Sequence, residues 1–238
     1  MDLLRAVMIG PQGTPYHDGL FFFDAQFPAS YPASPPTVYY HSGGLRLNPN
    51  LYACGKVCLS LLGTWEGHGC EKWNSAHSTM LQVLISIQAL VLNEKPYFNE
   101  PGYETYANNA SGQRTALEYN DTTFQYSCRT MLYSLRRAPQ HFEDLVAGHF
   151  RERGRAILAA CKYYMEGNKV GSVVPDEDDE DKELESANAE GSSVVRPASF
   201  KTNMEVLFEE LLMEFNVKGA DTKKFCAEKL KKSQPAAA

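Results

Sequence analysis

Three short apolar segments, separated by turn residues, set the strongest constraint on how this chain can fold. Residues 3–9, 20–27 and 37–41 have strand lengths and are rich in aliphatic or aromatic side chains. The first connection contains Gly10-Pro11 and Thr14-Pro15, and the second contains four prolines between Pro28 and Pro36. The pattern predicts an antiparallel meander of three strands.

The remainder of the chain predicts helices. Residues 78–92 have apolar side chains at helical spacing, and because these run nearly all the way round we expect this helix to be buried. Two further helices are expected over about 115–136 and 139–166, the second with Pro139 in its first turn. The chain is therefore expected to contain both strands and helices. A final amphipathic helix is indicated by an apolar stripe, Met204, Leu207, Phe208, Leu211, Leu212 and Phe215.

Charge divides the chain into a body, a linker and a tail. The net charge is −6, and residues 171–195 alone carry nine acidic residues and one lysine. We expect a core domain over 1–167, a disordered acidic linker over 168–200 and a helical segment over 201–238. A body without a basic surface argues against nucleic-acid binding, and no apolar run is long enough to span a membrane. Without a visible signal peptide, the six cysteines indicate reduced thiols in the cytoplasm or nucleus.

The segment most informative about chemistry is residues 47–62, which lacks sustained periodicity and carries Cys58 eight positions after Asn50. A thiolate can act as a nucleophile and can carry an acyl group as a thioester. An amide side chain can donate to the oxyanion that forms when an amine attacks that thioester. Acyl transfer between thiols and amines does not strictly require a histidine base beside the cysteine.

At these residues the sequence resembles the ubiquitin-conjugating enzyme family. The family signature is His-Pro-Asn, a glycine and an aliphatic-Cys-Leu, which here reads Asn48-Pro49-Asn50, Gly55 and Val57-Cys58-Leu59. The two turn regions and Trp73 also match, so the resemblance covers about residues 3–165. Three features resemble the large plant-type members with N-terminal extensions, including the hybrid conjugating enzyme/ligase branch: Asn48 in place of histidine, the insertion at 63–72 and the loop at 96–103.

The resemblance implies a function, its partners and its fold. Cys58 is the expected thioester nucleophile for ubiquitin, and Asn50 is the expected oxyanion donor or loop scaffold. The expected partners are ubiquitin, its activating enzyme, a ligase and protein substrates that carry the acceptor lysine. No cofactor is expected, because the activating enzyme consumes the ATP. The expected fold class is α/β, of the α+β kind: an antiparallel sheet backed by helices, without the first helix and first strand of the family.

Three further positions carry weaker expectations. Asn48 is expected to keep a structural hydrogen-bonding role, because asparagine retains a donor and an acceptor. Glu100 is a candidate acidic gate for the incoming lysine, with a solvated loop carboxylate as the alternative. Ser60 stands where some family members carry an acid, which indicates a less negative gate.

Other functions remain as alternatives at this point. A zinc site formed by Cys54, Cys58, His68 and Cys70 has an irregular spacing that disfavours it. A non-catalytic domain that binds ubiquitin or a ligase is favoured by the expected lack of the first helix. A cysteine hydrolase that pairs Cys58 with His68 or His77 ranks last.

Overall fold

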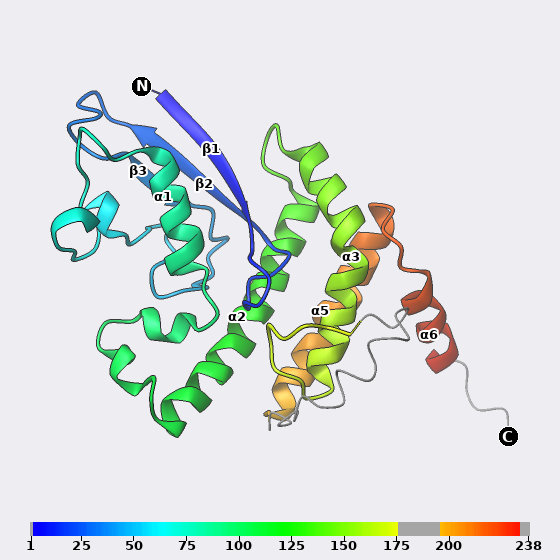
Figure 1. The fold of residues 1–238 in the computed structure, drawn as a ribbon. Coiled ribbons are helices and arrows are strands. Elements are labelled where there is room, and N and C mark those ends of the chain that lie inside the picture. Colours follow the sequence, from blue (N-terminus) through cyan, green and yellow to red (C-terminus); the bar gives the residue numbers. More distant parts are fainter. Residues whose placement is uncertain (1, 176–195, 234–238) are drawn as a thin grey trace, which may run out of the picture. The chain divides into compact units, whose positions relative to one another are not determined.

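A computed structural model describes residues 2–175 and 196–233, with side chains to residue 231 (Figure 1). The chain divides into two compact units, Met1–Thr130 and Met131–Ala238. Most of the expected acidic linker, residues 176–195, lies outside the described residues. The expected domain boundaries at 167 and 200 stay predictions. No helix among the described residues is both long and apolar enough to cross a membrane.

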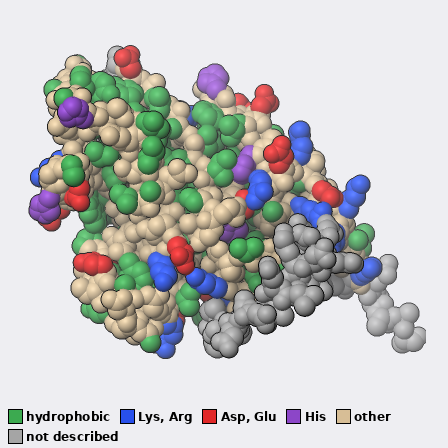
Figure 2. All heavy atoms as spheres, viewed as in Figure 1, with side chains coloured by type: hydrophobic (Ala, Val, Ile, Leu, Met, Phe, Trp, Pro, Cys, Tyr) green, Lys and Arg blue, Asp and Glu red, His purple; other side chains and the backbone are tan. Residues whose placement is uncertain are grey.

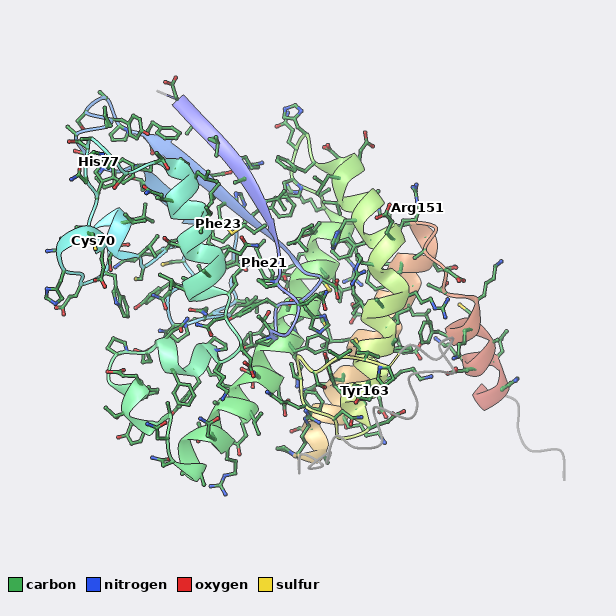
Figure 3. All side chains as sticks on the ribbon, viewed as in Figure 1. Phe21, Phe23, Cys70, His77, Arg151 and Tyr163 are labelled. Carbon is green, nitrogen blue, oxygen red and sulfur yellow. The ribbon has the colours of Figure 1, made fainter. Side chains whose placement is uncertain are left out.

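The first unit contains the predicted meander. Strands β1 (Asp2–Ile9), β2 (Leu20–Phe27) and β3 (Thr37–Tyr40) form one antiparallel sheet in chain order. The register pairs Met8 with Phe21 and Phe23 with Tyr40, so alternate side chains of each strand reach the same face. Figure 3 labels Phe21 and Phe23 on β2, where both belong to the main hydrophobic core.

The helix expected over 78–92 exists, but the expectation that it is buried on all sides is wrong. It consists of α1 (Met80–Ser86) and a π-helical turn, η3 (Ile87–Val91). Only the face that carries Val83, Ile87 and Val91 joins the core of the sheet. Leu81, Ile85 and Leu90 are 64%, 52% and 63% exposed. Hydrophobic side chains accordingly gather at the surface over α1 (Figure 2).

Two predicted helix starts are corrected by local capping and backbone geometry. Helix α2 (Ala110–Arg136) begins five residues earlier than expected, because the Asn109 side chain accepts a hydrogen bond from the Gly112 amide at 2.6 Å. Helix α3 (Glu143–Met165) begins after Pro139, not around it. His141 has a left-handed backbone with φ of 70°, which separates the proline from the helix.

The second unit is helical and contains the predicted amphipathic segment as α5 (Ala198–Val217), followed by α6 (Lys223–Ser233). Five of the six residues in the predicted stripe are buried, and Phe215 stacks on Phe150 of α3 with ring centroids 5.7 Å apart. Arg136 donates to Glu210 and Glu214 of α5 at 2.6 and 2.8 Å. The stripe is thus confirmed as the packing face of this helix.

Short 3₁₀ turns complete the first unit and carry the loops around the candidate site. They are η1 (Ser60–Leu62), η2 (Gly69–Glu71), η4 (Pro96–Asn99) and η5 (Tyr103–Tyr106). Glu100 follows η4 directly, so this turn sets where its carboxylate lies.

Candidate functional site

A small hairpin between residues 50 and 58 holds both predicted catalytic residues. Leu51 and Val57 form an antiparallel bridge, and the Cys58 amide donates to the Asn50 carbonyl at 2.9 Å. Both bridge side chains are buried in the core. Because side chains alternate along extended chain, the neighbours of these two residues, Asn50 and Cys58, lie on the opposite face. The hairpin thus brings together the two residues that the sequence separates by eight positions.

The hairpin turn requires the glycine of the motif. Gly55 has φ of +88°, and a Cβ at this position would lie 2.0 Å from the Tyr39 ring. The Gly55 carbonyl accepts a hydrogen bond from the Tyr40 amide at 2.8 Å. The turn is therefore attached to the end of β3, which fixes the hairpin against the sheet.

Asn48 has the structural role expected of it. Its side chain is fully buried, and its Nδ2 donates to the Val91 carbonyl at 2.7 Å and to the Tyr16 hydroxyl at 2.9 Å. Its Oδ1 accepts from the Asn50 amide at 2.8 Å. Asparagine thus uses both its donors and its acceptor to tie the start of the hairpin to the helix behind it.

We expect Asn48→Ala to lower the free energy of unfolding by about 2 kcal/mol, because it leaves the buried Asn50 amide without its acceptor. The Val91 carbonyl keeps a weaker bond from Asn99 at 3.3 Å, which limits the loss. Urea unfolding of the variant against Asn108→Ala, an exposed position, measures the difference. Equal midpoints for the two variants would show that the Asn48 bonds contribute nothing.

Asn50 lies beside the thiol and is engaged with its backbone. Its Nδ2 donates to the Cys58 carbonyl at 3.0 Å, and the residue is 9% exposed. Its Oδ1 is buried and accepts no hydrogen bond from any described residue. An amide nitrogen has two N–H groups, so the bond to Cys58 occupies only one of them. The geometry fits a loop scaffold and leaves a second donor for an oxyanion.

Cys58 is a buried residue and is 2% exposed. Burial raises the pKa of the thiol, since removal from water disfavours the thiolate. Lys56, Tyr52 and the charge of Arg46 lower this pKa, while Cys54 raises it further. The positive charges of Lys56 and Arg46 favour the thiolate, but burial has the larger effect, and the pKa of Cys58 stays above its ordinary value.

The Glu100 carboxylate contacts Arg46 at 3.3 Å, and both side chains are partly exposed. Arg46 also lies over the Tyr52 ring, with its Cζ 4.8 Å from the ring centroid. The motif spacing did not identify Arg46, Tyr52 and Lys56 as members of the site. The sequence gives one signal for two of them. Tyr52 and Lys56 are each an even number of positions from Cys58, so in extended chain their side chains lie on the same face as that of Cys58.

The other residues named from sequence have local contacts of their own. The Ser60 hydroxyl donates to the Glu66 carbonyl at 2.9 Å, within the insertion. Within residues 2–175 and 196–233, no hydrogen bond or ion pair joins His68 or His77 to Cys58. Figure 3 labels Cys70 and His77 at separate points of the segment that follows β3 and precedes α1 in the chain. No group of three or more His, Cys, Asp or Glu among the described residues could hold a metal ion.

Comparison with known proteins identifies a family that matches this chain. Residues 1–124 match the family model described as "Ubiquitin-conjugating enzyme". The Arabidopsis thaliana protein "Probable ubiquitin-conjugating enzyme E2 26" is 55% identical over 90% of this chain, and "Putative ubiquitin-conjugating enzyme E2 38" from the same plant is 54% identical over 90%. The human "Dual E2 ubiquitin-conjugating enzyme/E3 ubiquitin-protein ligase BIRC6" is 42% identical over 69%. The matched regions span 38%, 64% and 4% of these three relatives.

Proposed function

We propose, because this chain belongs to the ubiquitin-conjugating enzyme family, that it transfers ubiquitin to lysines of protein substrates. Plant members and a hybrid conjugating enzyme/ligase are among its relatives, in agreement with the resemblance read from the motifs. Cys58 is the proposed carrier of ubiquitin, and Asn50 the proposed stabiliser of the oxyanion.

The reaction has two acyl-transfer steps. In the first, the Cys58 thiolate attacks the thioester that joins the ubiquitin carboxyl end to the activating enzyme. The new C–S bond forms on Cys58, and the thiolate of the activating enzyme leaves. In the second step, a neutral lysine amine attacks the Cys58 thioester and a C–N bond forms, the C–S bond breaks, and the amine loses a proton to water. The product is an isopeptide, and the Cys58 thiolate is regenerated.

The observation that carries this proposal is the hairpin, which holds an amide donor and a thiol on one face. The Asn50 amide lies 3.0 Å from the backbone carbonyl of Cys58, so a donor is already beside the residue that would carry the acyl group. A donor fixed before the reaction stabilises an oxyanion without reorganisation during the step.

The proposed partners are ubiquitin, the activating enzyme, a ligase and protein substrates. The chain itself needs no cofactor in this proposal, since ATP is spent by the activating enzyme when it forms its own thioester. We propose the cytoplasm or the nucleus as the compartment, because catalysis through Cys58 requires a free thiol.

A charging assay tests the proposal. The purified chain is mixed with activating enzyme, ubiquitin and ATP and is run on a non-reducing gel. We expect an adduct larger by one ubiquitin, which a thiol reductant removes. A folded sample that gives no adduct at any pH between 7 and 9 would contradict the proposal.

The burial of the thiol favours a second candidate, a non-catalytic domain that binds ubiquitin or a ligase. A cysteine that is 2% exposed must become accessible before ubiquitin can be loaded onto it. This candidate predicts no adduct, yet binding of ubiquitin or ligase to the uncharged chain, which calorimetry would detect.

A further inference from the structure

We propose that Arg46 is a positioning residue for the Cys58 thiol. Arg46 holds the Tyr52 ring on the face of the hairpin that carries the thiol, and Glu100 holds Arg46 in place. The inference rests on the proposed function, because it assigns residues that make Cys58 reactive. It gives Glu100 a different role from that of a gate for the incoming lysine.

Arg46 is fixed by three partners at once. Its Nη2 lies 3.3 Å from the Glu100 carboxylate and 3.4 Å from the Pro49 carbonyl, and its Cζ lies 4.8 Å from the centroid of the Tyr52 ring. A guanidinium is planar and stays charged at any pH that proteins tolerate, so it can stack on a ring and bind a carboxylate together. Glu100 follows η4, and Arg46 precedes the Asn-Pro-Asn motif, so the ion pair joins two loops of the first unit.

Tyr52 also contacts Lys56. Its amide donates to the Lys56 carbonyl at 3.0 Å, which places the two residues opposite each other in the hairpin. The Lys56 ammonium lies 5.8 Å from the centroid of the same ring. Two cations therefore contact one ring, on the face of the hairpin that also carries Cys58.

This arrangement acts on the charge state of the thiol. Burial and Cys54 raise the pKa of Cys58, whereas Lys56, Tyr52 and Arg46 lower it. Arg46 contributes directly through its charge and indirectly by fixing the Tyr52 side chain. Because only the thiolate is nucleophilic, the cluster increases the fraction of Cys58 that can react near neutral pH.

The test is the pH profile of alkylation of Cys58 by iodoacetamide, which requires neither ubiquitin nor activating enzyme. Thiolate sulfur forms a bond to the CH₂ carbon and iodide leaves, so the rate follows the thiolate fraction. Peptide mass spectrometry separates Cys58 from the other five cysteines. The variants are Tyr52→Phe, which removes only the hydroxyl, and Arg46→Gln. Tyr106→Phe and Arg114→Gln are the matched controls at exposed positions.

We expect the midpoint of the alkylation profile to rise by about 0.5–1 pH unit in Tyr52→Phe and in Arg46→Gln, and to stay unchanged in the two controls. At neutral pH, alkylation of Cys58 then slows roughly three- to tenfold. Glu100→Gln is expected to raise the midpoint by a smaller amount, since Arg46 loses its ion pair but keeps its charge. Unchanged midpoints in Tyr52→Phe and Arg46→Gln would overturn the proposal.

Charging with ubiquitin separates this inference from the proposed function. If both hold, Arg46→Gln is charged more slowly at pH 7 and at nearly the wild-type rate at pH 9. If alkylation profiles shift but no variant or wild-type chain is charged, the inference stands and the proposed function fails. If Glu100→Gln slows only transfer to lysine and leaves the alkylation profile unchanged, Glu100 acts as a gate and its assigned role is wrong.

Discussion

Cys58→Ala is expected to abolish the ubiquitin adduct completely, and Cys58→Ser to replace it with an adduct that survives thiol reductant. The alanine side chain offers no atom that can form a thioester. The serine hydroxyl can accept the acyl group as an oxygen ester, which thiols cleave slowly and hydroxide cleaves readily. The readout is a non-reducing gel of each variant, followed by reductant and by mild alkali on parallel lanes.

The main rival acceptor is Cys54, which is exposed and lies four residues before the buried Cys58. Accessibility alone would favour Cys54, whereas the position beside the Asn50 amide favours Cys58. Cys54→Ala is therefore expected to keep the adduct, as is Cys70→Ala, whose cysteine is exposed in the insertion. An adduct that persists in Cys58→Ala and disappears in Cys54→Ala would show that Cys54, and not Cys58, carries ubiquitin.

The β-meander was predictable because turn chemistry and strand composition agree along residues 3–41. Proline and glycine mark both connections, and each strand ends within about a residue of its expected limit. The burial of α1 was not predictable from composition. Its apolar side chains nearly surround the helix, but a helix that packs on one sheet can bury only one face. Periodicity does not state how many partners a helix has.

The predicted first residues of α2 and α3 were wrong for a different reason. The Asn109 cap of α2 and the left-handed His141 before α3 are single-residue events that a hydrophobic pattern does not register. In both cases the apolar stripe identified the helix, and a polar or strained residue at its end determined where it begins.

The candidate site divides in the same way. Cys58 and Asn50 could be named from spacing, because the motif carries the chemistry in its own residue types. Arg46 and Glu100 are far apart in sequence, and their ion pair depends on how two loops lie. Tyr52 could be assigned to the site only from the Leu51–Val57 bridge, which sets the register of the hairpin. A shift of one residue would turn Tyr52 and Cys58 toward the core.

Asn50→Ala is expected to slow transfer of ubiquitin from Cys58 to lysine by about 100-fold, with charging of Cys58 reduced only a few-fold. Loss of one oxyanion donor removes stabilisation that is present only while the amine attacks. Asn50→Asp keeps the shape of the side chain but offers acceptors only, and its charge opposes the developing oxyanion. We therefore expect Asn50→Asp to be at least as slow. Single-turnover discharge of the purified thioester to free lysine measures this step without the activating enzyme.

A purely structural Asn50 makes a different prediction, because its amide also supports the hairpin through the Cys58 carbonyl at 3.0 Å. If support of the loop is its whole role, Asn50→Ala would lower charging, discharge and the urea midpoint together. Asn48→Ala then provides the matched comparison, since it weakens the same hairpin from its buried end without removing a donor beside the thiol. Equal losses in both variants would assign Asn50 to the scaffold. A discharge defect found only in Asn50→Ala, at a urea midpoint close to that of the wild type, would assign it to the oxyanion.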